Sequence, residues 1–239
     1  MHILLAALVG AIAGPFTHHI AVQAGADLSF ALSAAACRRC GASSDLLSTC
    51  DSCGLSPWRA WLTSVATALL AALAAWRFGS QAVVGAYIAF AVLTVALFLT
   101  DIDHKRIPNR ISYPGTVATA ALLAVTAWID GETSAVPRAL VGGLVYAAAF
   151  GLIYLAARGG FGFGDVKLAV SLGIFTAFVG WRSLFVAGLA TAAVGGLVAL
   201  AAVLFARAGA KTEIPYGPPM IIGSWIAIVG GSELVSVVF

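Results

Sequence analysis

The sequence predicts an all-α fold, a polytopic membrane helix bundle of about eight transmembrane helices. Of its 239 residues, 61% are hydrophobic and 10% are charged, and the mean hydropathy is +1.01. A soluble domain carries about 25% charged residues. The chain has too few charged residues to shield all of its apolar segments from water. The lipid bilayer is therefore the expected environment. The net charge of +3 gives no general attraction to nucleic acid, so no nucleic-acid partner is expected.

A membrane-spanning helix needs roughly 20 mostly apolar residues. We expect spans at approximately residues 3–22, 58–76, 81–100, 113–129, 138–157, 166–181, 183–206 and 219–238. Pro15, His18 and His19 interrupt the first span, and the two histidines are expected to be interfacial polar residues. This span lacks the basic region and cleavage site of a secretory signal, so we expect it to be retained. The short break at Trp181-Arg182 predicts a tight hairpin between the sixth and seventh spans.

The basic residues divide unevenly between the two sets of connections that alternate along eight spans. One set holds ten of the thirteen Lys and Arg residues, and the other holds only Arg77, Arg138 and Arg182. Cytoplasmic connections carry the excess of Lys and Arg. The ten-residue set is therefore predicted to be cytoplasmic, with both termini outside. This set comprises Arg38, Arg39, Arg59, Lys105, Arg106, Arg110, Arg158, Lys167, Arg207 and Lys211.

Two aspartates stand where lipid makes a charge costly. Asp101 directly follows the apolar run 91–100, and Asp165 opens the sixth span. The charge division places both at the cytoplasmic ends of their spans, where two carboxylates from separate helices can meet. Two such groups a few ångströms apart share a proton, because they cannot both ionise cheaply. The ionised carboxylate then takes a proton from water while the protonated one hydrogen-bonds a peptide carbonyl. Asp101 and Asp165 are thus the candidate catalytic residues of an aspartyl protease.

Other interpretations of these residues remain open. Asp103 could replace Asp101 as the partner of Asp165, although Asp101 adjoins the apolar span and should be the more desolvated. An isolated aspartate at a helix boundary is usually an interfacial or capping residue. A carboxylate pair could also form the ion site of a proton- or cation-coupled transporter. That function predicts polar groups deep within several spans, whereas the deep positions here are almost entirely apolar.

The four cysteines form two CxxC pairs separated by nine residues: Cys37, Cys40, Cys50 and Cys53. Four thiolates at this kind of spacing can hold one structural zinc ion tetrahedrally. Two disulfides, or the reactive thiols of a membrane thiol-disulfide enzyme, are the alternatives. Both need an oxidising compartment, whereas the basic residues predict that this loop is cytoplasmic.

Three motifs resemble those of the type IV prepilin peptidases, which are GxGD membrane aspartyl proteases. Gly162-Phe-Gly-Asp-Val-Lys-Leu168 is similar to the GxGDxKL form of their signature. Asp101 stands seven positions before Pro108-Asn109, like the Asp of the family's first motif. Residues 214–218, Ile-Pro-Tyr-Gly-Pro, resemble the Pro-Phe-Gly-Pro segment that opens the family's last helix. The matches follow the family's order over roughly residues 58–239. Preflagellin peptidases and presenilin-like proteases share GxGD, and the four-cysteine loop favours the prepilin branch.

The resemblance implies a peptidase that removes the leader of prepilin or pseudopilin membrane substrates on the cytoplasmic side of the bacterial inner membrane. Cleavage in the family follows a glycine. Membrane lipids are the other expected partner. The resemblance covers a peptidase core at 58–239, preceded by a helix and four-cysteine loop at 1–57. We expect substrate contacts at Asp103, Gly162, Gly164 and Lys167, where the glycines allow a substrate strand to approach closely.

Many family members also methylate the new amino terminus with S-adenosylmethionine. That activity is associated with an N-terminal Gly-Ser-Phe-x-Asn-like segment. The corresponding residues here are Gly14-Pro-Phe-Thr-His-His19. This departure argues against S-adenosylmethionine as a cofactor.

Overall fold

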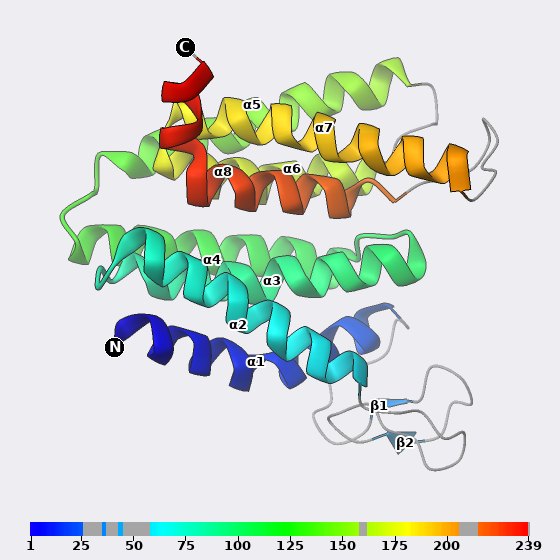
Figure 1. Cartoon of the computed structure of the whole chain (residues 1–239), viewed down its shortest axis with the longest axis horizontal. Helices are drawn as coiled ribbons and strands as arrows, with labels where there is room; N and C mark the ends of the chain where they lie inside the picture. Colours follow the sequence, from blue (N-terminus) through cyan, green and yellow to red (C-terminus); the bar gives the residue numbers. More distant parts are fainter. Residues whose placement is uncertain (26–34, 37–42, 45–57, 158–161, 206–214, 239) are drawn as a thin grey trace. The chain divides into compact units, whose positions relative to one another are not determined.

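The computed structural model describes residues 1–25, 35–36, 43–44, 58–157, 162–205 and 215–238, which form eight helices and one pair of two-residue strands (Figure 1). The predicted all-helical class is confirmed, and each predicted span corresponds to one helix. In chain order the elements are α1 (His2–Gly25), β1 (Ala35–Ala36), β2 (Ser43–Ser44), α2 (Trp58–Phe78), α3 (Val83–His104), α4 (Asn109–Ile129), α5 (Ala135–Ala156), α6 (Phe163–Val179), α7 (Trp181–Phe205) and α8 (Gly217–Val238).

Six of the helices in the described part of the chain, α1 to α5 and α7, are long and apolar enough to cross a membrane. Helix α6 has 17 residues, and α8 contributes a shorter apolar helix at Gly217–Gly230. Large apolar side chains remain exposed along these helices, among them Leu197, Leu200 and Leu204 on α7. An apolar surface that extends over many helical turns is unfavourable in water and is accommodated in lipid. The chain is a multi-pass membrane protein.

The chain divides into two compact units, residues 1–126 and 127–239. In the first unit, α1 and α2 pack closely through small residues (Figure 1). A Cβ atom on Gly10 would lie 2.6 Å from the carbonyl oxygen of Thr67, and one on Gly14 would overlap Ser64. The Thr67 hydroxyl donates a hydrogen bond of 2.7 Å to the Gly10 carbonyl. Small residues four apart allow helix backbones to approach in lipid, and Gly10 and Gly14 serve that purpose here.

The C-terminal half of α1 is more polar and more buried than we expected. His18 and His19 are 4% and 3% exposed, so both side chains are buried within the protein, and their interfacial depth in the membrane stays a prediction. His19 Nε2 lies 2.9 Å from Gln23 Nε2, one helical turn further along. Because α1 continues to Gly25, these side chains belong to a helix face that packs within the unit, not to a helix end.

In the second unit, α5 packs against α6 and α7 against α8. The first contact depends on glycine, since a Cβ atom on Gly173 would lie 2.7 Å from the Gly142 carbonyl oxygen. Arg138, in the first turn of α5, binds the end of α6: its Nε donates to the Ala177 carbonyl at 2.8 Å and its Nη2 to Phe178 at 2.6 Å. The last carbonyls of a helix have no hydrogen-bond donors within the helix, and the Arg138 guanidinium supplies donors to two of them.

The break between α6 and α7 comes at Gly180, one residue before the predicted position. Trp181 and Arg182 therefore begin α7 and do not form the connection. Gly180 is extended and donates its N–H to the Thr176 carbonyl at 3.3 Å, which closes the last turn of α6. The tight hairpin itself is as predicted.

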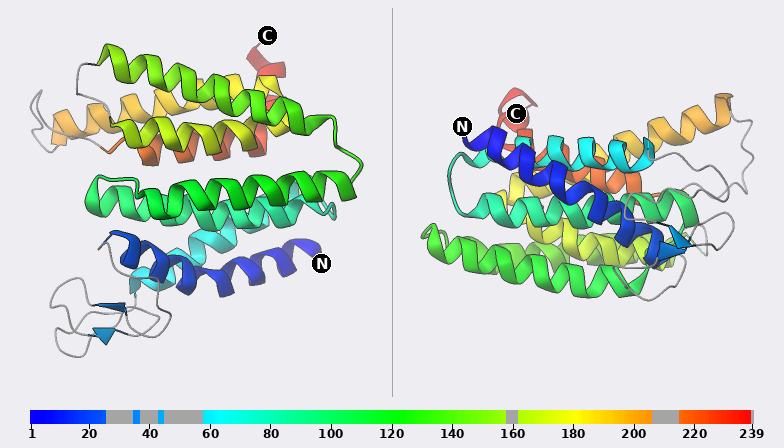
Figure 2. Two further views of the ribbon diagram at one scale, coloured as in Figure 1. Left: turned by 180° about the vertical axis from the view of Figure 1, so that it is seen from behind. Right: turned by 90° about the horizontal axis from the view of Figure 1, so that it is seen from below.

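Strands β1 and β2 pair antiparallel, with Ala35 opposite Ser44 and Ala36 opposite Ser43. They lie next to α1 (Figure 2), and β1 contacts that helix. The pair brackets residues 37–42. The four cysteines lie outside the described residues, and the zinc loop therefore stays a prediction.

Candidate catalytic carboxylates

Asp101 lies within the last turn of α3, where the sequence alone placed it just after the helix. The helix continues to His104 and ends at Lys105, whose N–H donates to the Asp101 carbonyl at 2.8 Å. Lys105 has a φ of 49°, the left-handed conformation that commonly terminates a helix. The Asp101 side chain is buried, at 5% exposure. The predicted desolvation of this carboxylate is therefore confirmed.

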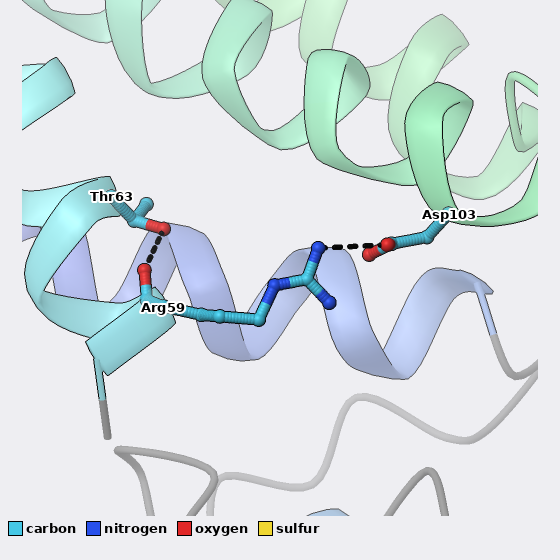
Figure 3. A network of polar contacts seen from close by, with 3 residues as sticks. All are labelled: Arg59, Thr63 and Asp103. Carbon is cyan, nitrogen blue, oxygen red and sulfur yellow. Dashed lines mark hydrogen bonds and ion pairs between the residues drawn. The ribbon is translucent and has the colours of Figure 1, made fainter. Parts of the chain in front are cut away.

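Asp103 lies two residues further along the same turn and is paired with a cation. Its Oδ1 accepts a hydrogen bond from Arg59 Nη2 at 2.8 Å (Figure 3). Asp103 is less buried than Asp101. Arg59 comes from the first turn of α2, so the pair joins two helices of the first unit. Sequence reasoning counted Arg59 only as a cytoplasmic charge, because no local pattern links residues 44 positions apart.

Asp165 lies in the first turn of a helix, whereas Asp101 lies in the last turn of one. Helix α6 begins at Phe163 after Gly162, which is extended with φ −83° and ψ 138°. The Asp165 N–H donates to the Gly162 carbonyl at 3.1 Å, and the side chain is 7% exposed. The first-turn N–H groups give this end of the helix a partial positive charge. Asp165 is thus a buried carboxylate in the first turn of a helix.

The residues around Asp165 include three of the predicted substrate contacts. A Cβ atom on Gly162 would lie 3.4 Å from Asp165 Oδ2, so this glycine adjoins the carboxylate. Gly164 is the second residue of α6. Lys167 extends over the Phe163 ring, with its Nζ 5.1 Å from the ring centroid. This cation–π contact holds the ammonium group at the start of α6.

Tyr216, just before α8, also lies close to Asp165. Burial raises the pKa of the Tyr216 phenol, and the negative charge of Asp165 raises this pKa further. The ring packs on α7, where a Cβ atom on Gly195 would lie 2.9 Å from the Tyr216 hydroxyl oxygen. Its centroid lies 6.4 Å from that of Phe150. Tyr216 belongs to the Ile-Pro-Tyr-Gly-Pro segment at residues 214–218. That segment alone does not indicate that Tyr216 lies close to Asp165.

Within each unit, the candidate residues gather at the end predicted to be cytoplasmic. In the first unit the end of α3 meets the start of α2 through the Asp103–Arg59 pair. In the second unit, the starts of α6 and α8 lie beside the last turns of α5. Tyr154 contacts Phe163 there at 5.6 Å between ring centroids. Asp101 and Asp165 belong to different units, and their pairing remains a prediction. Among the described residues, no group of three or more His, Cys, Asp or Glu side chains is placed to hold a metal ion.

Comparison with known proteins agrees with these features. Residues 88–200 match the model of the type IV leader peptidase family. A prepilin leader peptidase/N-methyltransferase of Pseudomonas aeruginosa is 30% identical over 191 residues, or 77% of this chain and 63% of that protein. A Bacillus subtilis protein of the same name is 30% identical over 178 residues, or 71% of this chain and 65% of that protein. The chain spans less than two thirds of the length of these relatives. No solved structure matches it with significance.

The fold is that of a multi-pass helical membrane protein with a buried aspartate in each of two helix-end turns. Residues 88–200, the segment similar to the type IV leader peptidase family, contain both Asp101 and Asp165.

Proposed function

We propose that this protein is an aspartyl endopeptidase that removes the leader of type IV prepilins or pilin-like secretion subunits. One observation carries the proposal: the segment that matches the leader peptidase family contains both buried aspartates. The names of the relatives describe the same processing activity. The names also include N-methylation. We leave that activity outside the proposal, because residues 14–19 depart from the family segment associated with it.

The two aspartates would divide the chemistry according to the helix ends that carry them. Asp165 in the first turn of α6 lies near a partial positive charge, which favours the carboxylate that takes a proton from water. Asp101 in the last turn of α3 lies near a partial negative charge, which favours the protonated acid that hydrogen-bonds the scissile carbonyl. The water oxygen then attacks the carbonyl carbon, and the proton that Asp165 has taken passes to the departing amide nitrogen. No covalent intermediate forms.

The substrate is a membrane protein with a short basic leader ahead of an apolar helix. Gly162 adjoins the Asp165 carboxylate and has no side chain of its own, which suits the approach of an extended peptide strand. Gly164 and Lys167 lie in the first turns of the same helix. The excess of basic residues in the connections at this end supports a cytoplasmic active site in a bacterial inner membrane. Cleavage on that side corresponds to the cytoplasmic position of a leader.

We further propose that Cys37, Cys40, Cys50 and Cys53 hold one structural zinc ion. Four thiolates are the donor set of closed structural zinc sites, and the short β1–β2 pair brackets the first CxxC. When bound, the ion would fix the fold of the loop and take no part in peptide hydrolysis. Metal analysis of the purified protein should find one zinc per chain, and Cys40→Ser should lower that content.

The test of the function is cleavage of a purified prepilin by the purified protein in lipid vesicles. Wild type should release the leader with a single new amino terminus, identified by mass spectrometry, and Asp165→Asn should release none. A substrate whose leader is deleted serves as the control for specificity. If a correctly inserted Asp165→Asn variant cleaves as wild type does, the peptidase assignment is wrong and an ion site becomes the better explanation of the aspartates.

A further inference from the structure

The ion pair between Arg59 and Asp103 is a direct polar link between α2 and α3. Figure 3 shows the Arg59 side chain extending from the first turn of α2 to the last turn of α3. Its Nη2 donates to Asp103 Oδ1 at 2.8 Å, and the two side chains are 35% and 16% exposed. The Thr63 hydroxyl donates to the Arg59 carbonyl at 2.8 Å, which ties the first turn of α2 to the next.

The turn that accepts this bond carries a carboxylate at a helix C-terminus, where a negative charge is disfavoured. A helix C-terminus carries a partial negative charge, and carboxylates placed there destabilise the last turn. Here the last turn of α3 carries Asp103 beside the proposed acid Asp101, followed by His104 and the C-cap residue Lys105. It also ends on Lys105 in the left-handed conformation, which is costly for a residue with a side chain. The Arg59 guanidinium brings a positive charge to this turn from a different helix.

From this geometry we infer that Arg59 is a positioning residue: by binding Asp103 it holds the last turn of α3, and thereby the side chain of Asp101, in place. The inference rests on the proposed peptidase function. It also gives Asp103 a structural partner, where the sequence suggested a substrate contact. Arg59 acts through Asp103 and touches no reacting atom.

Two roles for Asp103 predict opposite kinetics. If the pair positions Asp101, removing either member lowers kcat and leaves KM nearly unchanged, because substrate binding is untouched. If Asp103 instead binds the basic leader, Asp103→Asn raises KM. Arg59→Gln then lowers KM, because it releases the carboxylate for the substrate.

The experiment measures kcat and KM for prepilin cleavage by wild type, Arg59→Gln, Asp103→Asn, the double variant, Arg59→Lys, and the charge exchange of Arg59→Asp with Asp103→Arg. We expect each single neutral variant to lose about tenfold in kcat, the scale on which small displacements of catalytic groups act. The double variant should lose no more than one single variant, because both changes break the same link. Arg59→Lys and the charge exchange should recover part of the loss.

Arg77→Gln is the matched control, since it removes an arginine from the opposite end of the same helix, where Arg77 contacts the Phe78 ring at 5.4 Å. It should retain the wild-type kcat. The positioning role is overturned if KM changes in opposite directions in the two single variants, or if their losses multiply in the double variant. It is also overturned if neither single variant changes kcat. Failure of the proposed function would look different, because wild type itself would then not cleave.

Discussion

At the scale of single residues, Asp101 and Asp165 show how position changes the behaviour of one side-chain type. Both are buried, at 5% and 7% exposure, but one ends a helix and the other begins one. The helix end beside Asp101 carries a partial negative charge, and the one beside Asp165 a partial positive charge. This difference is the basis on which we propose Asp101 as the acid and Asp165 as the base.

Tyr216 provides a test that depends on pH. Burial, and then the charge of Asp165, raise the pKa of its phenol above the ordinary value of 10.0. The folded protein thus holds this proton more tightly than the unfolded chain does. The resulting stability is fully present below pH 10.0 and is lost as the pH rises through the higher folded-state value. In thermal unfolding between pH 8 and 11, wild type should lose more stability than Tyr216→Phe.

Tyr216→Phe keeps the ring that packs beside Gly195 and Phe150, so the two proteins should unfold at similar temperatures near pH 8. The remaining tyrosines are common to both and cancel in the comparison. Equal losses of stability at high pH would show that neither burial nor the Asp165 charge raises the pKa of Tyr216 in the folded protein.

At the scale of elements, glycine determines which helices approach closely. Gly10 and Gly14 serve the contact of α1 with α2, and Gly142 and Gly173 serve that of α5 with α6. In lipid no hydrophobic effect drives helices together, so close backbone packing contributes much of the association.

Two adjacent glycines on α7 allow a matched comparison. A Cβ atom on Gly195 would collide with the Tyr216 ring, while one on Gly196 would meet nothing within 4 Å. We expect Gly195→Ala to displace Tyr216, to destabilise the protein by about 1–3 kcal/mol and to lower cleavage. Gly196→Ala should leave unfolding and cleavage unchanged. Chemical unfolding in mixed micelles, with the cleavage assay, measures both effects, and equal behaviour of the two variants would refute the predicted contact.

Much of the fold could be predicted because long apolar runs are a local signal. Each helix was located from its hydropathy, and even the short α6 was found. The ends were less accurate: α3 continues through Asp101 and Asp103, because its C-cap depends on the conformation of Lys105 and not on hydropathy. The burial of His18 and His19 was also missed, since it depends on which face of α1 packs inward.

At the scale of the whole molecule, the charge pattern predicts how the chain is inserted in the membrane. Ten basic residues fall in one set of connections and three in the other. Of those three, Arg138 is used to bind the end of α6. The asymmetry in the remaining connections is what the positive-inside rule requires.

Reporter fusions test this orientation. Alkaline phosphatase, which is active only outside the cytoplasm, should be active when fused after Gly131, between α4 and α5. It should be inactive when fused after Gly209, between α7 and α8. A cytoplasmic reporter at the same two positions should give the reverse pattern. If phosphatase were active at Gly209 instead, both candidate carboxylates would lie on the wrong side for a leader peptidase.

The candidate site was predicted only in part, for a reason that belongs to the whole molecule. Motifs pointed to Asp101 and Asp165 one at a time, because each lies in a short recognisable segment. The ion pair of Arg59 with Asp103 and the position of Tyr216 depend on contacts between distant helices, which no motif contains. The cysteine loop lies outside the described residues, and its zinc remains a proposal.

The most direct test of the central claim compares three substitutions that each remove one carboxylate and keep its shape. Prepilin cleavage by Asp101→Asn, Asp103→Asn and Asp165→Asn is measured in vesicles with equal amounts of inserted protein. The account predicts no detectable cleavage by Asp101→Asn or Asp165→Asn, and roughly a tenth of the wild-type rate for Asp103→Asn. Cleavage that survives the loss of Asp101 but not of Asp103 would transfer the catalytic role to Asp103. Cleavage that survives the loss of Asp165 would contradict the aspartyl dyad altogether.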